Sequence, residues 1–173
     1  MLGKILDVVR HFPGKARVLD IGFGTEVLTT RLYELGHTIS GVDFPSRMVA
    51  IAAEKMPLAR LVRFDIQNGL PEHINKEKFD IIISTYALHH LPDTNKITFI
   101  QNLLDLLAPG GKILIGDVAF DSRVNLEKCK AACGTEWDTE EFYFVMDEIT
   151  PRLAAGVTFE AASHCAGVIV IQR

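Results

Sequence analysis

The sequence has few cysteines, no run of basic residues and no long hydrophobic stretch. Three cysteines among 173 residues leave at least one unpaired, which favours a reducing compartment over a disulfide-linked secreted protein. The net charge is −4 and Lys and Arg form no run, which disfavours nucleic acid as a partner. The apolar stretch from Ala166 to Ile171 is too short to span a bilayer, and no signal peptide is visible. We therefore expect a cytoplasmic protein that does not enter a membrane.

A metal site is also not expected. Cys129 and Cys133 stand four residues apart and would share one face of a helix. Zinc sites are usually built from two such pairs of Cys or His, and no second pair lies close to these two in the sequence. We interpret both as half-buried helix cysteines.

Two glycine-rich nucleotide-binding motifs are missing. In the dinucleotide motif G-x-G-x-x-G the third glycine would fall at Val27, and the Gly-Lys-Ser/Thr of a phosphate-binding loop does not occur. The composition, with 48% hydrophobic and 23% charged residues, fits one globular domain that comprises residues 1–173. The chain is thus expected to hold its ligand with a different turn.

The stretch from Val18 to Thr25 predicts a strand, a tight turn and the start of a helix. Asp20 lies in the strand, and Gly22 and Gly24 form the turn. A glycine lets a ligand approach the backbone closely, and the helix that follows presents free N–H groups at the turn. A nucleotide-like ligand is therefore expected there.

Two further acids follow at the ends of the next two predicted strands. Asp43 and Asp65 come at intervals of about twenty residues, and an acid at the first of these positions binds the ribose hydroxyls in Rossmann-like folds. In an open parallel sheet, ligands bind outside the carboxyl ends of the strands. Because Asp20, Asp43 and Asp65 recur at three successive strand ends, together they indicate a ligand site more strongly than any one of them does alone.

This ordered set of motifs resembles the class I S-adenosylmethionine-dependent methyltransferases. The set includes Asp20-Ile21-Gly22-Phe23-Gly24, the apolar strand from Phe79 to Ser84, and Pro109-Gly110-Gly111 after a helix. The sequence from Ser84 to Leu91, together with that from Gly110 to Ile113, is similar to the corresponding segments of the small bacterial YrrT-like methyltransferases. The resemblance implies an enzyme that transfers a methyl group from S-adenosylmethionine to a small-molecule substrate.

The resemblance also implies the fold. We expect an α/β protein with the three-layer Rossmann-like methyltransferase fold, whose mostly parallel sheet has seven strands and closes with an antiparallel hairpin. The hairpin is expected over Val157–Ala162 and Cys165–Gln172, and the last helix over Glu140–Leu153. The polar segment Val118–Trp137 matches no regular pattern, and in this family it usually carries substrate-specific residues.

The family's cofactor contacts fall on nine residues of this sequence. Asp20 would bind the ammonium group, Gly22 and Gly24 would make room, and Asp43 would bind the ribose. The adenine would lie between Phe44 and Met48, with its amino group on Asp65 and a ring nitrogen on the N–H of Ile66. Ser84, where the fourth strand ends, completes the set. The alternatives are that Met48 is a core residue and Asp65 an acid in a surface turn.

The loop after the fourth strand faces the methyl group in this family. Tyr86 and His89 are therefore expected to contact the substrate, and a histidine suits the role of general base. The alternative for His90 is that it caps the next helix. No single catalytic residue is indicated, because the reaction depends mainly on alignment.

Two departures from the family pattern support a second hypothesis. Glu26 stands where a third glycine is usual, and an inward-facing carboxylate there would repel the carboxylate of the cofactor. The sequence also begins only about fifteen residues before its first strand, so we expect an open pocket. A second copy of the chain in a homodimer, or chain preceding this sequence, would then cover it. The alternative function is a lapsed methyltransferase that acts as a binding domain. A nicotinamide-dependent oxidoreductase is disfavoured by Val27 and by the closing hairpin.

Overall fold

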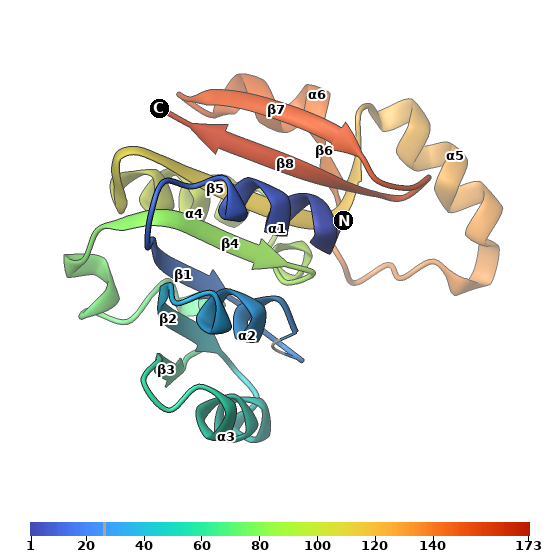
Figure 1. Cartoon of the computed structure of the whole chain (residues 1–173). Coiled ribbons are helices and arrows are strands. Elements are labelled where there is room, and N and C mark those ends of the chain that lie inside the picture. The colour runs from blue at the N-terminus through green and yellow to red at the C-terminus, as the bar shows by residue number, and fades with distance from the viewer. Residues whose placement is uncertain (26) are drawn as a thin grey trace.

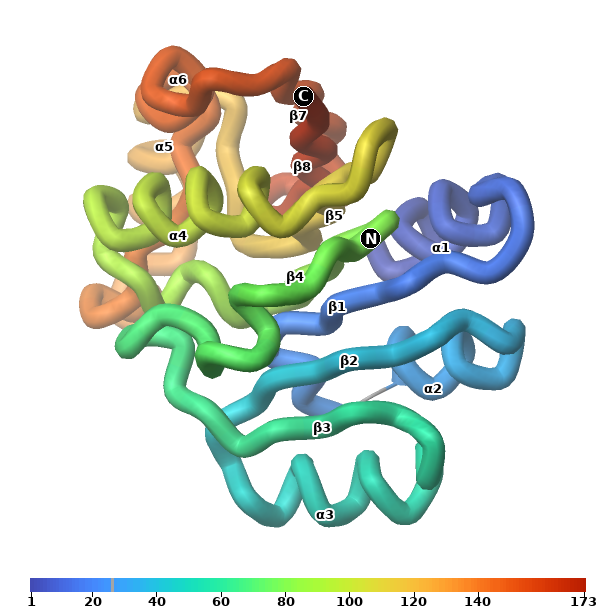
Figure 2. Tube along the Cα trace, turned by 90° about the vertical axis from the view of Figure 1, so that its left-hand side faces the viewer, coloured from blue at the N-terminus to red at the C-terminus, as the bar shows by residue number. Residues whose placement is uncertain are grey.

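The computed structural model describes residues 1–25 and 27–173. A mixed sheet forms the middle of three layers, with helices on both faces (Figures 1 and 2). The helices are α1 (Leu2–Arg10), α2 (Val27–Glu34), α3 (Ser46–Lys55), α4 (Asp93–Asp105), α5 (Arg123–Cys133) and α6 (Met146–Ile149). The strands are β1 (Arg17–Ile21), β2 (Thr38–Asp43), β3 (Arg60–Arg63), β4 (Phe79–Thr85), β5 (Leu107–Phe120), β6 (Phe144–Val145), β7 (Gly156–Ala161) and β8 (Ala166–Gln172).

The strand order is β3-β2-β1-β4-β5-β8-β7. The first five strands run parallel, whereas β8 is antiparallel to β5 and β7 is antiparallel to β8. The chain builds the sheet outward from β1 in one direction and from β4 in the other. A ligand crevice therefore opens beyond the carboxyl ends of β1 and β4, where the order reverses. The expected parallel sheet with a closing hairpin is confirmed.

The expected number of seven strands is wrong by one. An eighth, two-residue strand, β6, pairs in parallel with Ala119 and Phe120 at the end of β5. It lies within Glu140–Leu153, which was expected to be one helix, but the α-helix there is limited to the four residues of α6.

Contacts with distant parts of the chain hold the segment before β6 in an extended form. The N–H of Phe142 donates to the carbonyl of His89 at 2.8 Å, and the ammonium of Lys96 donates to the carbonyl of Phe142. Lys96 is fully buried, so its hydrogen bonds are costly to lose. A helix across this segment would remove these hydrogen bonds. The local pattern of apolar residues does not reveal them, because their partners lie far away in the sequence.

The polar segment without a regular pattern contains α5. Leu126 and Cys129 are the buried residues of this eleven-residue helix. Its amphipathic pattern is therefore weak, which explains why only the spacing of Cys129 and Cys133 indicated a helix here. Cys129 is buried and Cys133 is exposed, so the expectation that both are half-buried is wrong.

The core fixes the end of β1 from both faces of the sheet, because alternate residues of a strand point to opposite sides. Leu19 packs in one apolar cluster with Ile100 of α4. Val18 packs in another with Ile5 of α1 and Leu32 of α2. The turn after β1 therefore begins from a rigidly held strand.

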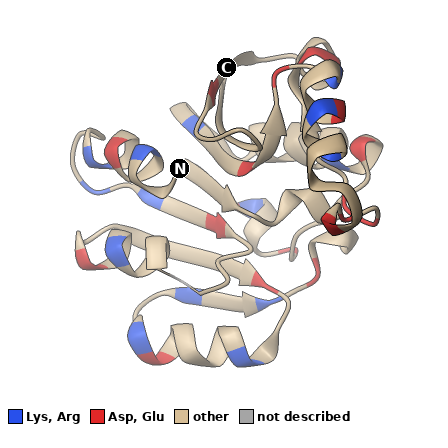
Figure 3. Ribbon diagram, turned by 90° about the vertical axis from the view of Figure 1, so that its right-hand side faces the viewer, with Lys and Arg blue, Asp and Glu red and all other residues tan. Residues whose placement is uncertain are grey.

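Within the described residues, no helix is long and apolar enough to cross a membrane. Figure 3 shows Lys and Arg interspersed with Asp and Glu rather than gathered into one basic stripe.

Candidate functional site

The turn after β1 depends on its two glycines. Gly22 has φ +70° and Gly24 has φ +50°, and both values lie in the left-handed region that side chains rarely adopt. A Cβ on Gly22 would also lie 2.4 Å from the Cβ of Ala87, in the loop after β4. The turn and that loop therefore pack closely because no side chain separates them.

Asp43, at the end of β2, holds this turn in place. Its Oδ2 accepts a hydrogen bond from the N–H of Gly24 at 2.6 Å, and its Oδ1 accepts one from the N–H of Phe44 at 2.7 Å. The residue is 8% exposed and lines a cavity. Each carboxylate oxygen has further acceptor capacity, so Asp43 can accept from two hydroxyl groups of a ligand.

The cavity has a volume of about 360 Å³ and lies beyond the carboxyl ends of the central strands. The arrowheads of β1, β2 and β4 point toward this edge in Figure 1. Its volume is at the lower end of the range for small-molecule sites. The residues that line it are Gly22, Gly24, Asp43, Phe44, Pro45, Phe64, Asp65, Ile66, Gln67, Tyr86, Ala87 and His90.

An aromatic ring and an acid form the wall of the cavity near β2 and β3. Phe44 is 55% exposed, and the guanidinium of Arg63 lies 5.4 Å from its ring centre. Arg63 also donates from Nε to the carbonyl of Phe44 at 3.1 Å, so it fixes both ring and backbone. Asp65 accepts from the N–H of Gln67 at 2.9 Å and thereby orders the turn that presents Ile66.

Tyr86 occupies a strained backbone position beside the cavity. Its φ is +51°, and among the described residues it is the one non-glycine with a positive φ. Its N–H donates to the carbonyl of Gly116 at 2.9 Å, which holds this conformation. Such strain in a bulky, exposed residue is characteristic of functional sites, because the surrounding structure must maintain it.

Asp20 lies buried beneath the turn, with 1% exposure. The hydroxyl of Thr29 donates to its Oδ2, whereas Oδ1 has no hydrogen-bond partner among the described residues. The pKa of Asp20 is raised to about 7, because the effect of burial, together with a smaller contribution from the negative charge of Asp43, outweighs the lowering effect of the hydrogen bond from Thr29. A buried acceptor of this kind has a strong preference for a cationic donor.

His89 lies behind the cavity in a network of acids. Its Nδ1 is 2.6 Å from Oδ1 of Asp117, and its Nε2 is 3.3 Å from Oε1 of Glu141. Burial lowers the pKa of His89, but the hydrogen bond and charge of Asp117 and the charge of Glu141 outweigh burial, and the net shift is upward. Its ring contacts that of His90 edge to face, with centroids 4.2 Å apart. His89 thus supports His90, which reaches the cavity.

The structure brings seven of the predicted site residues into the cavity lining: Gly22, Gly24, Asp43, Phe44, Asp65, Ile66 and Tyr86. Among the described residues, those that line the cavity do not include the other four predicted site residues, Asp20, Met48, Ser84 and His89. Met48 is half-buried on α3, and the hydroxyl of Ser84 donates to the carbonyl of Ile21 at 3.0 Å, where it joins β4 to β1. Ligand contact remains a prediction for all eleven residues. Glu26, on which the lapsed-enzyme hypothesis depended, lies outside the described residues.

Sequence reasoning missed several residues of the site. Arg63 and Phe64 immediately precede Asp65, so their position at a strand end was the available signal. Pro45 and Gln67 adjoin predicted contacts in the same way. His90 was expected to contact the substrate less than His89; in the structure His90 lines the cavity, whereas Nδ1 of His89 lies against Asp117.

Comparisons with known proteins agree with this geometry. Residues 18–111 match the family described as methyltransferase domain. An uncharacterized methyltransferase of Bacillus cytotoxicus is 32% identical over an alignment that covers 91% of this chain and 77% of the relative. One of Anoxybacillus flavithermus is 40% identical over 69% of this chain and 54% of its own length.

Solved structures show the same fold at low sequence identity. The DhpI–SAM–HEP complex has a TM-score of 0.73 at 16% identity and is matched over 99% of this chain and 86% of its own. Magnesium protoporphyrin IX methyltransferase of Synechocystis PCC 6803, solved with bound SAH, has a TM-score of 0.73 at 17% identity, over 99% and 82%. With the family match over more than half of its length and a relative aligned over nine-tenths of it, this chain belongs to the methyltransferase domain family.

Proposed function

We propose that this protein transfers a methyl group from S-adenosylmethionine to a nucleophilic atom of a small molecule. The observation that carries the proposal is the cavity at the carboxyl ends of β1 to β4, with Asp43 and Asp65 in its lining. When bound, S-adenosylmethionine supplies an electrophilic methyl group on a sulfonium centre. The role of the protein is then to bind, orient and exclude water.

The residues of the site fit the parts of this cofactor. Asp43 offers acceptors for the two ribose hydroxyls, and Phe44, fixed by Arg63, offers an apolar ring face to the adenine. Asp65 suits the adenine amino group as an acceptor. The unpartnered Oδ1 of Asp20 suits the ammonium group of the amino-acid part, because a buried carboxylate is stabilised by a positive donor.

The substrate side of the cavity is formed by Tyr86 and His90. Both are exposed, and both line the cavity on the loop after β4. His90 is the group suited to accept a proton from a substrate nucleophile or to orient it, and His89 positions His90 from behind through its bond to Asp117. The cavity, of about 360 Å³, is in the size range of small-molecule sites.

The proposal is tested by the formation of S-adenosylhomocysteine from S-adenosylmethionine. The purified chain is incubated with small thiols, amines and hydroxylated metabolites in one series, and with RNA and unfolded protein in another. We expect turnover in the first series alone. Turnover confined to RNA or protein would contradict the small-molecule acceptor.

The cofactor affinity of the Asp43→Asn variant tests whether Asp43 belongs to the cofactor site. The substitution keeps the shape of the side chain but removes a charge that accepts hydrogen bonds, so we expect about tenfold to a hundredfold weaker cofactor binding. Asp105→Asn is the matched control, because Asp105 forms a surface ion pair with Arg173 away from the cavity. Equal affinities in the two variants would remove Asp43 from the site.

A further inference from the structure

The thiols of Cys129 and Cys165 lie beside the ring of His164, and the thiol of Cys133 lies beside that of Cys129. Cys129 and Cys133 are on α5, whereas His164 and Cys165 lie in the connection between β7 and β8, which Figure 1 shows next to α5. The ligand atoms of Cys129, His164 and Cys165 all lie within 4.8 Å of one another. The Sγ atoms of Cys129 and Cys133 are 4.0 Å apart, and all three cysteines are free thiols.

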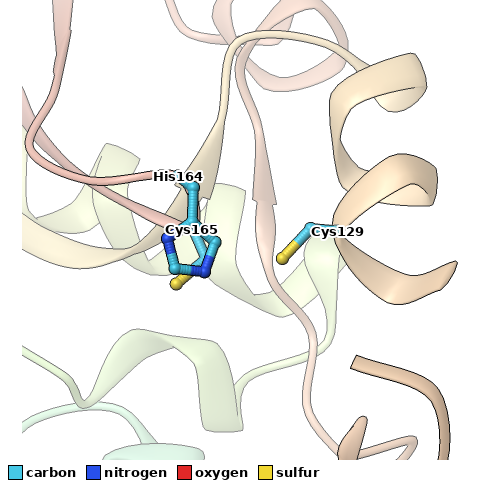
Figure 4. A group of neighbouring side chains, drawn as sticks. All are labelled: Cys129, His164 and Cys165. Carbon is cyan, nitrogen blue, oxygen red and sulfur yellow. The ribbon is translucent and has the colours of Figure 1, made fainter. Parts of the chain in front are cut away.

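We propose that Cys129, Cys133, His164 and Cys165 form a binding site for a thiophilic divalent cation, Zn²⁺. In Figure 4 the sulfur of Cys129 points from α5 toward the connection that carries His164 and Cys165. Three thiolates and one imidazole are a ligand set that Zn²⁺ accepts in structural sites. The site shares no lining residue with the methyltransferase cavity, so it does not depend on the function proposed above.

For a zinc ion to bind, the distances between the ligand atoms of the cluster would need to shorten only slightly. Zinc–sulfur bonds of about 2.3 Å and zinc–nitrogen bonds of about 2.0 Å place tetrahedral ligand atoms roughly 3.5–3.8 Å apart. The separation of 4.0 Å between the two helix thiols is close to this value. His164 is exposed and Cys165 is half-buried, and both lie between strands, so their side chains can approach Cys129 by rotation.

The chemistry of the side chains suits a thiophilic cation. Thiols interact with one another only by weak hydrogen bonds, whereas thiolates are strong ligands for soft divalent cations. A bound metal ion replaces the proton of each thiol that it binds, and the proton passes to solvent.

The site would anchor a helix that has little apolar contact of its own. Leu126 and Cys129 are the buried residues of α5, and they pack in one cluster with Phe120 of β5. Trp137 and Tyr143, in the segment between α5 and β6, pack against the same cluster, and the ring of Tyr143 lies 6.4 Å from that of His89. A metal ion between α5 and the hairpin would therefore fix the wall of the molecule beside His89 and His90.

The sequence argued against a metal because no second pair of Cys or His lies close to Cys129 and Cys133 in the chain. The structure supplies the second pair from the hairpin, His164 and Cys165, which is more than thirty residues away in sequence. The closing hairpin was predicted, and Cys129 and Cys133 were placed on a helix, but the packing of the hairpin against that helix depends on tertiary contacts that the sequence pattern does not show.

Cobalt titration tests the site directly. The full chain, reduced with a phosphine and freed of metal with a chelator, is titrated with Co²⁺, whose thiolate complexes absorb by charge transfer. We expect one Co²⁺ per chain, with this absorption, and displacement by Zn²⁺. His164→Ala and Cys165→Ser should weaken binding at least about tenfold. His73→Ala, at an exposed histidine elsewhere, should bind as the wild type does.

Three results would overturn the proposal: no thiolate-to-cobalt absorption in the wild type, unchanged affinity in Cys165→Ser, or equal losses in His164→Ala and His73→Ala. His164 is exposed, so its variant should keep the fold, and circular dichroism checks this. Cys133→Ser tests the fourth ligand, and an unchanged charge-transfer intensity there would overturn the four-residue site.

Discussion

Asp20 is the residue whose protonation couples most directly to the fold. Because its pKa is raised to about 7 in the folded chain, the folded state holds this proton more tightly than the unfolded state does. Stability from this group is therefore present at low pH and is lost as the pH rises from about 4 to about 7.

We predict that Asp20→Asn removes this loss. The free energy of unfolding of the wild type, measured relative to the variant by urea denaturation, should fall between pH 4 and pH 7 by up to about 1.4 kcal/mol per pH unit. The difference should be constant below and above that range. Parallel stability curves across the range would show that the folded chain does not shift this pKa.

At Tyr86, one substitution is expected to affect stability and activity differently. A left-handed residue other than glycine costs about 1–2 kcal/mol, so Tyr86→Gly relieves strain while it removes a ring that is 52% exposed. We predict that the free energy of unfolding does not fall but that turnover does. Leu58→Gly, at an exposed residue with ordinary φ, should lose about 0.5–1 kcal/mol. A stability loss in Tyr86→Gly as large as in Leu58→Gly would contradict the strain.

Residues of the site were predictable where they form part of a local motif. Four of them lie at or just after the ends of three successive strands, and all four line one cavity in the structure: Gly22, Gly24, Asp43 and Asp65. His89 and His90 are adjacent in sequence, and only the packing of Asp117 decides which one faces the cavity. Such choices depend on tertiary contacts that the spacing of residues does not encode.

The turn between β1 and α2 is the element on which the site depends. Gly22→Ala adds strain at φ +70° and a contact of 2.4 Å with the Cβ of Ala87, whereas Gly14→Ala adds strain at φ +83° in open space. We predict that Gly22→Ala lowers the free energy of unfolding by about 1–3 kcal/mol more than Gly14→Ala does, and that it weakens cofactor binding.

The double variant Gly22→Ala with Ala87→Gly tests the cause. If the clash between the two Cβ atoms is responsible, removing the second one should restore most of the additional loss, as measured in a double-mutant cycle. Additive losses in the cycle would show that the two positions do not interact.

Elements with strong apolar periodicity were predicted and weakly patterned ones were not. The strand expected at the start of Val18–Thr25 and the apolar strand expected over Phe79–Ser84 are present as β1 and β4. The expected helix over Glu140–Leu153 is wrong, because Lys96 and His89 hold the segment before β6 through backbone hydrogen bonds. These bonds join segments about fifty residues apart, and they outweigh the local preference for a helix.

At the scale of the whole molecule, the parallel part of the sheet follows from the alternation of strands and helices. The closing hairpin distinguishes this fold from a plain dinucleotide fold. Placement of the cavity at the point where the strand order reverses is the consequence that matters for function. The packing of α5 against the hairpin, and hence the cysteine and histidine cluster, required the tertiary structure.

The central claim is that the cavity beyond β1 to β4 binds S-adenosylmethionine, and calorimetric titration of the purified chain with S-adenosylhomocysteine tests it most directly. NADH serves as the control, because it shares the adenosine part but belongs to the oxidoreductase alternative. We predict one site per chain with a dissociation constant in the micromolar range for S-adenosylhomocysteine and no binding of NADH. Failure of S-adenosylhomocysteine to bind, or binding of NADH with equal affinity, would contradict the claim.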